Sequence, residues 1–239
     1  MESLEWSSCL ETAAPQCAPL GDRALQIRLG DRLDLGVNTR VHQLVRRIRT
    51  AQLPGLTDLV PAYTTLTVHY HPAHWRFEEL VRTLTPLIDA ADALDMPPGR
   101  AVVLPICYGG AFGPDLEIVA AHAGLTANEV IQRHRAGIYR VYFLGFSPGF
   151  AYLGGLDPAL AMARRATPRP MVAAGSVGIA GAQTGIYPHT TPGGWQIIGR
   201  TPLQLFEPNR TPPCLLAPGD TLRFNAISAD AFDALASVP

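Results

Sequence analysis

The sequence predicts an α+β protein in which a small N-terminal α/β domain precedes a β-barrel domain. Between residues 19 and 94, strand-like and helix-like segments alternate, as they do where helices pack on a sheet. Residues 96–99 read Met-Pro-Pro-Gly, a combination that ends a helix and suits a linker. From residue 138 onward, short strand-like runs are separated by turns rich in Gly and Pro, a pattern typical of a closed or nearly closed barrel.

The N-terminal domain is expected to contain strands and helices in alternation. Residues 24–29 alternate apolar and polar side chains, and residues 63–70 are β-branched and aromatic, so both segments predict strands. A helix should begin at residue 38 or 39, because apolar residues then follow at helical spacing at Val41, Leu44, Val45 and Ile48. A second amphipathic helix is expected over residues 77–88, with a kink or interruption at Pro86.

The barrel domain should begin and end with strands, over residues 101–107 and 221–224. Between them, Thr126 and Glu129 have the spacing of a capping box, which predicts the start of a helix. Short strands and turns, without long helices, are expected to fill the rest of this domain.

The expected boundaries give a loose tail over residues 1–18, an α/β domain over residues 19–97 and a barrel domain over residues 98–239. The tail has no basic region ahead of an apolar stretch, so it does not predict a secretory signal. No apolar run in the sequence is long enough to span a bilayer. The four cysteines are scattered, without a CxxC pair or a dense disulfide pattern, which favours a reducing cytoplasm.

The composition excludes several classes of chemistry. A net charge of −1 and a hydrophobic content of 47% suit a globular protein and give no electrostatic case for binding nucleic acid or bulk membrane. All nineteen basic residues are arginine, which excludes a Schiff-base lysine and a phosphate-loop lysine. Any anion held by a charged side chain must therefore be held by Arg or His.

The segment over residues 175–185 has glycines three and four residues apart. Its backbone N–H groups could form a concave nest that binds an anion, or its glycines could stand at β-turns and a bulge. Arginine can grip phosphate or carboxylate through two nitrogens, and the neighbouring basic residues are Arg164, Arg165, Arg169 and Arg200. Anion or nucleotide binding therefore stays open beside the structural alternative.

Two further motifs have competing interpretations. His134 lies near the apolar stripe of its helix, so it is either a hydrogen-bonded core histidine or a side chain that points into a site. Ser147 stands in a Gly-Phe-Ser-Pro-Gly turn like a hydrolase nucleophile, but the following Pro148 has no N–H for an oxyanion hole. The serine is therefore expected to be a turn residue. Separately, we expect no metal site in the chain.

Five blocks occur in the order GFSPGFAYL, TPRP, AAGSVGIAGAQTGIYP, TPGGW and IIGRTP. In these blocks the chain resembles the family formed by the B subunit of bacterial 5-oxoprolinase. That family is also called allophanate hydrolase subunit 1 and includes KipI-type inhibitors of sporulation kinases. The resemblance implies a small N-terminal α/β domain followed by a cyclophilin-like β-barrel domain, in agreement with the fold class above.

The resemblance implies one subunit of an ATP-dependent 5-oxoprolinase, which converts 5-oxo-L-proline to L-glutamate. ATP, with Mg²⁺, would be a co-substrate. A protein like the C subunit of that enzyme would be the close partner and one like its A subunit a further partner, and the chain alone is expected to be inactive. Two alternatives stay open: a subunit related to urea carboxylase and allophanate hydrolase, or a KipI-like inhibitor of a sensor histidine kinase.

The same blocks and the helix before them supply the expected site. We expect catalysis to rest on Arg200, Gln183, Tyr187 and His134. Substrate or nucleotide binding is expected at Tyr152, Arg169, Gly175, Ser176, Gly178, Thr184, Gly194 and Trp195. The turns that carry these residues should converge on one side of the barrel.

Overall fold

The computed structural model describes residues 15–91 and 99–237 of the 239-residue chain. The chain divides into two compact units, residues 1–96 and residues 97–239, and each has its own hydrophobic core. The α+β fold class, with a closed β-barrel in the second unit, is confirmed. Most of the expected linker, residues 96–98, lies outside the described residues.

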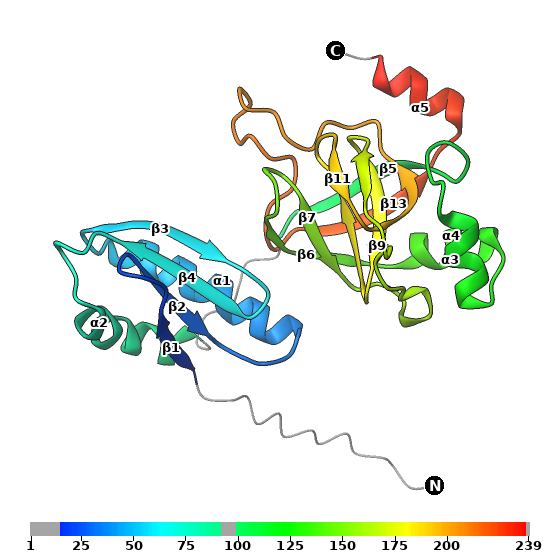
Figure 1. Cartoon of the computed structure of the whole chain (residues 1–239). Helices are drawn as coiled ribbons and strands as arrows, with labels where there is room; N and C mark the ends of the chain where they lie inside the picture. Colours follow the sequence, from blue (N-terminus) through cyan, green and yellow to red (C-terminus); the bar gives the residue numbers. More distant parts are fainter. Residues whose placement is uncertain (1–14, 92–98, 238–239) are drawn as a thin grey trace, which may run out of the picture. The chain divides into compact units, whose positions relative to one another are not determined.

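The N-terminal unit is an antiparallel sheet with helices packed on one face (Figure 1). The strands lie in the order β1-β2-β4-β3, so β1 and β3 are the edges. Their bounds are Gln16–Pro19 for β1, Ala24–Arg28 for β2, Leu56–Pro61 for β3 and Thr65–Tyr70 for β4. The core lies between this sheet and two helices, α1 (Leu35–Ala51) and α2 (Phe77–Asp89).

The helices of this unit differ from expectation at their ends. Helix α1 begins three residues before residue 38, because the Asp34 side chain accepts a hydrogen bond from the N–H of Val37 and caps the first turn. Helix α2 continues through Pro86 to Asp89, so the expected interruption does not occur. Pro86 lies in the last turn of α2 and removes one backbone hydrogen bond there. Because only three helical residues follow it, the rest of the helix is unaffected.

The strands at both edges of the sheet differ from the sequence-based expectation. Residues 16–18 fall in the expected tail, but they pair with β2 as part of β1. Strand β3 was not predicted either, because it ends in Pro61 and follows Gly55, which are both unfavourable in a strand interior. An edge strand tolerates proline because one side of its backbone needs no partner.

The C-terminal unit is a closed barrel with strand order β10-β7-β6-β13-β5-β12-β9 (Figure 1). Strands β5 and β13 pair in parallel, and the other neighbouring pairs are antiparallel. The bounds are Ala101–Tyr108 for β5, Tyr139–Leu144 for β6, Ala151–Gly154 for β7, Ser176–Ala180 for β9, Gln183–Ile186 for β10, Gln196–Arg200 for β12 and Thr221–Ala226 for β13.

Smaller elements flank the barrel. A separate two-stranded sheet joins β8 (Arg169–Val172) to β11 (Thr191–Gly193). Helices α3 (Leu116–Ala123) and α4 (Ala127–Ala136) contact each other and the barrel, and a short 3-10 helix, η2 (Pro158–Leu160), lies against α3. Helix α5 (Ala229–Ala236) follows β13.

The capping box is confirmed, since Thr126 and Glu129 make both reciprocal hydrogen bonds. The strands predicted at residues 101–107 and 221–224 correspond to β5 and β13. Helix α5 was not predicted, because Phe232 is its one buried residue and a single apolar anchor gives no helical stripe.

The core of the N-terminal unit predicts that this unit can fold without the barrel. A fragment ending at residue 96 should give a cooperative thermal transition by circular dichroism, because its core contains residues from both helices and from β2 and β4. Leu44 is fully buried in that core, so Leu44→Ala should reduce the free energy of unfolding by about 2–5 kcal/mol. A broad, non-cooperative melt of the unmutated fragment would show that the unit depends on the barrel.

Candidate functional site

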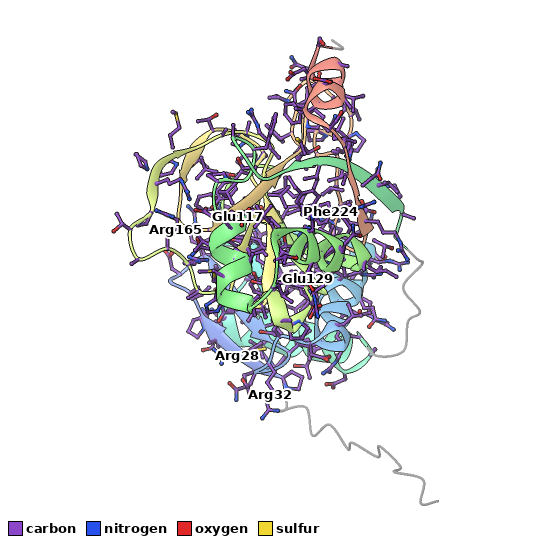
Figure 2. All side chains as sticks on the ribbon, turned by 90° about the vertical axis from the view of Figure 1, so that its right-hand side faces the viewer. Arg28, Arg32, Glu117, Glu129, Arg165 and Phe224 are labelled. Atoms are coloured by element: carbon purple, nitrogen blue, oxygen red, sulfur yellow. The ribbon has the colours of Figure 1, made fainter. Side chains whose placement is uncertain are left out.

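A buried carboxylate ties several segments of the barrel unit together. Asp115, immediately before α3, is 1% exposed and accepts a hydrogen bond from the N–H of Ile197 on β12 at 2.7 Å. Arg169 binds both carboxylate oxygens, at 2.7 and 2.8 Å, and Arg165 binds one at 3.1 Å. The hydrogen bond to Asp115 raises the pKa of the Arg169 guanidinium. These contacts fix β8 and the loop before it, where Figure 2 labels Arg165, against α3 and β12.

Aromatic side chains form a second cluster, which we call the aromatic cluster. It contains Phe150, Tyr152, Tyr187 and Trp195, with the Trp195 ring centroid 5.5 Å from Phe150 and 6.0 Å from Tyr152. Burial raises the pKa of the Tyr187 phenol, and a hydrogen bond from the Trp195 backbone partly offsets this. The guanidinium carbon of Arg164 lies 5.9 Å from the Trp195 ring centre, within range of a cation–π interaction.

The glycine-rich segment forms a β-hairpin rather than an anion-binding nest. Strands β9 and β10 pair across it, and Gly178 lies opposite Gly185. A Cβ atom at Gly185 would come within 2.8 Å of the Trp195 ring, and one at Gly178 within 3.0 Å of the Trp195 Cβ. These glycines therefore let the tryptophan pack directly on the hairpin. Their backbones belong to the sheet, so the segment supplies a platform for Trp195 in place of phosphate ligands.

His134 on α4 lies in the core of the barrel unit. Its Nδ1 is 2.8 Å from the Tyr108 hydroxyl and its Nε2 is 3.1 Å from the Thr184 hydroxyl, which in turn donates to the Gly178 carbonyl. The ring stacks on Phe224 of β13, labelled in Figure 2, at a centroid distance of 4.6 Å. Burial lowers the pKa of His134 to about 3. The structure therefore favours the core-histidine alternative and places His134 away from any solvent-facing reaction.

A cavity of about 470 Å³ opens at the end of the barrel where β12 finishes. Its walls come from the segments before β9, after β10 and after β12, and from α5; they include His189, Arg200, Phe206 and Phe232. The Arg200 Nε donates to the Ala174 carbonyl at 2.7 Å, and its guanidinium carbon lies 5.7 Å from the Phe232 ring centre. We call this space the Arg200 cavity.

Gly175 holds the wall of this cavity in place. Its N–H donates to the Tyr187 carbonyl at 2.7 Å, and its own carbonyl accepts from the Thr201 N–H at 2.9 Å. Its φ of 82° lies in the left-handed region, and a Cβ atom here would come within 2.2 Å of the Thr201 oxygen. Glycine is therefore required for the close approach of the three segments.

The predicted site residues separate into three groups. Arg200 and Gly175 line the Arg200 cavity, while Tyr152, Tyr187 and Trp195 belong to the aromatic cluster. The cluster adjoins the cavity, because Tyr187 precedes a cavity residue and is bonded to Gly175. The other predicted residues lie in strands, turns or core contacts: Gln183, His134, Arg169, Ser176, Gly178, Thr184 and Gly194.

Several walls of the Arg200 cavity were missed. Thr201, Gln204 and Phe206 follow Arg200 closely in the chain, so the turn after that arginine carried a signal for a pocket wall. Phe232 carried no such signal, because it lies about thirty residues further on, in the unpredicted helix α5. Its place in the cavity depends on the barrel's topology, which places β13, the strand before α5, beside β5, and β5 in turn beside β12.

Other candidate chemistry is sparse in the described residues. Across residues 15–91 and 99–237, no group of three or more His, Cys, Asp or Glu side chains is arranged to hold a metal ion. None of the helices in those ranges is both long enough and apolar enough to cross a membrane. The described cysteines, Cys17, Cys107 and Cys214, are all unpaired.

The fold and sequence together define the class of protein. Residues 15–216 match the family described as "Carboxyltransferase domain, subdomain C and D". The chain is 45% identical to the B subunit of 5-oxoprolinase from Bacillus subtilis, over 91% of this chain and 95% of that protein. The corresponding protein of Escherichia coli O157:H7 is 42% identical, over 87% of this chain and 94% of its own length. The chain therefore belongs to the family of 5-oxoprolinase B subunits.

Solved structures agree with this assignment. A conserved uncharacterized protein from Pyrococcus horikoshii is 43% identical over 91% of this chain and all of its own, with a TM-score of 0.55. TTHA0988 is 38% identical over 87% of this chain, with a TM-score of 0.76, and this chain spans only 40% of it. Urea amidolyase from K. lactis shares the fold at a TM-score of 0.76 but only 19% identity, over 92% of this chain and 15% of its own.

The Asp115 contacts predict a large loss of stability when the carboxylate is removed. Asp115→Asn should lower the free energy of unfolding by about 2–4 kcal/mol, because two arginines and a backbone N–H lose a buried anion. The partly exposed Glu207–Arg210 pair in the same unit supplies the control, and Glu207→Gln should change that free energy by at most about 1 kcal/mol. Equal losses in denaturant unfolding of the two variants would contradict this account.

The burial of His134 predicts a dependence of stability on pH. In the unfolded chain this histidine gains a proton below a pH of about 6.5, whereas in the folded chain it stays neutral down to about pH 3. Its contribution is therefore complete above pH 6.5 or so and declines as the pH falls toward 3, by at most about 1.4 kcal/mol per pH unit.

The measurement is denaturant unfolding between pH 4 and pH 7 or thereabouts, for the wild-type chain and for His134→Gln. The variant has a lower stability at neutral pH, because its amide replaces the imidazole contacts imperfectly, but a shallower decline on acidification. Parallel curves for the two proteins would mean that His134 titrates alike in the folded and unfolded states.

Proposed function

We propose that this chain is one subunit of an ATP-dependent 5-oxoprolinase, which converts 5-oxo-L-proline to L-glutamate. The observation that carries the proposal is the 40–45% identity to three proteins named as the B subunit of 5-oxoprolinase, over 86–91% of this chain and 94–95% of theirs. A match over almost the full length of both chains favours the same role in the same complex.

The reaction hydrolyses the C–N bond of a lactam. Because an unstrained lactam is a poor electrophile, water attacks its carbonyl carbon only slowly. Coupling to ATP hydrolysis supplies the driving force, and the protein's part is to position the reactants and neutralise developing negative charge. Among the predicted site residues, Arg200 is the best placed for this task, because it lines a cavity. In this proposal the side chains of Tyr152, Tyr187 and Trp195 do not contact the reactants; as members of the aromatic cluster they support the cavity from behind its wall.

ATP and Mg²⁺ belong, in this proposal, to the assembled complex. In the glycine-rich hairpin Gly178 and Gly185 pair in the sheet, and the N–H groups of Gly175 and Gly181 donate to the Tyr187 and Met162 carbonyls, so the hairpin offers no nest for a triphosphate. The described residues include no acidic or His cluster suited to a divalent ion, although metal-bound ATP brings most of its own ligands. A partner protein is therefore expected to contribute the nucleotide contacts.

We propose a protein like the C subunit of 5-oxoprolinase as the close partner and one like its A subunit as the further partner. The similarity to TTHA0988 supports a protein partner, because the region like this chain makes up 40% of a longer polypeptide there. The unpaired cysteines are compatible with a reducing cytoplasm, where we place the complex. The alternatives have less support, since the urea amidolyase similarity extends to the fold alone.

Reconstitution tests the function. The chain mixed with its two partner proteins, those like the A and C subunits, should release glutamate from 5-oxo-L-proline only when ATP is present, and the isolated chain should give little or no turnover. Omitting each protein in turn provides the controls. Full activity without this chain, or rapid turnover by this chain alone, would each overturn the proposal that it is required but insufficient.

A further inference from the structure

The Arg200 cavity contains a guanidinium whose charge is not neutralised within the described part of the chain. Arg200 donates its Nε to the Ala174 carbonyl, and its other nitrogens have no hydrogen bond or ion pair to residues 99–237, the described part of its own unit. Its stem lies against Gly175, with Cγ 3.4 Å from the position of a Cβ there. One nitrogen is thus fixed, and the rest of the guanidinium is held beside the cavity that it lines.

We infer that the Arg200 cavity binds the carboxylate of a small monocarboxylic acid, whose CH₂ groups pack against Phe206 and Phe232. This inference rests on the proposed function for the identity of the acid, 5-oxo-L-proline. The geometry itself points only to a class of ligand: one planar anionic group attached to a compact body that has an apolar part.

The charge of the cavity favours a carboxylate over a phosphate. Arg200 is the one residue among its walls that is always cationic, and His189 is the other side chain there that can carry positive charge. The backbone N–H groups of Gly175 and Thr201 already bond to carbonyls, so they do not form an anion nest. A single guanidinium matches one carboxylate through paired N–H donors, whereas a triphosphate requires more positive charge.

Two aromatic side chains in the cavity walls suit the apolar part of the ligand. Phe206 lies edge-to-face with His189 at 5.8 Å, and Phe232 contacts both Phe112 at 4.6 Å and the Arg200 guanidinium. Pockets for small molecules combine mostly apolar walls with a few placed polar groups, and about 470 Å³ is within their usual range. Helix α5 therefore contributes to the binding site through Phe232.

One acidic side chain lies close enough to be considered as a competitor. Asp233 of α5 raises the pKa of the Cys107 thiol by its charge, after the larger effect of burial, and Cys107 is the strand neighbour of Arg200. Asp233 makes no ion pair with Arg200 in the described structure, so the guanidinium remains open to a ligand.

The test measures binding by isothermal titration calorimetry to the full chain and to the reconstituted complex. The probes are 5-oxo-L-proline, 2-pyrrolidinone, which keeps the lactam ring but lacks the carboxylate, and inorganic phosphate. We expect 5-oxo-L-proline to bind the full chain, and the other two probes to bind at least about tenfold more weakly, since a charged hydrogen-bond pair is lost or mismatched.

Arg200→Gln should weaken the binding of 5-oxo-L-proline by about tenfold or more, with the thermal midpoint nearly unchanged. Arg223→Gln is the matched control, because Arg223 is exposed on β13 and does not line the cavity. Phe232→Leu tests the apolar wall. It should weaken the binding of 5-oxo-L-proline but leave the preference of the cavity for 5-oxo-L-proline over phosphate intact.

The inference fails if 5-oxo-L-proline binds neither the chain nor the complex, if 2-pyrrolidinone or phosphate binds equally well, or if Arg200→Gln binds like the Arg223→Gln control. Failure of the proposed function has a different signature. In that case the wild-type chain binds 5-oxo-L-proline through Arg200, but the complex releases no glutamate with ATP. Conversely, an active complex that is indifferent to Arg200→Gln would leave the function standing and remove the site.

Discussion

The barrel unit depends most on the buried carboxylate of Asp115. Burying a single charged group is costly, and here the cost is offset by a backbone N–H and two arginines that come from different parts of the chain. The same contacts hold β8 and β12 in a fixed relation, and Trp195 immediately precedes β12. The position of the tryptophan, and of the aromatic cluster around it, therefore follows from a polar contact.

The hairpin of β9 and β10 connects that cluster to the Arg200 cavity. Gly178 and Gly185 accept Trp195 on one side, while Gly175, at the start of the hairpin, bonds to the segments after β10 and after β12. A larger residue at any of these positions would move backbone or an indole ring. Steric necessity thus explains a glycine pattern that, by its spacing alone, was equally compatible with an anion nest.

Much of the fold could be predicted because it depends on local patterns. The capping box of α4, the strand at β5 and the amphipathic helices were visible as periodicity and end signals. Residues that act through distant partners were not: by its place in the sequence Arg169 is a candidate anion ligand, whereas in the fold it pairs with Asp115, 54 residues earlier. The contribution of Phe232 was hidden for the same reason, since only barrel closure brings α5 to the cavity.

Because every Lys or Arg position in this chain is arginine, the structure is needed to distinguish structural cations from cations that can bind a ligand. With no lysine, residue type cannot distinguish a structural cation from one available to a ligand, so the partner of each guanidinium must decide. Carboxylates within the barrel unit pair with Arg100, Arg133, Arg165, Arg169 and Arg210. Arg200 differs, because it contacts a carbonyl and an aromatic ring, neither of which cancels its charge. A cation fixed in direction, partly shielded from water and still uncompensated is the physical requirement for recognising a small anion, and this arrangement sets Arg200 apart from those five paired arginines.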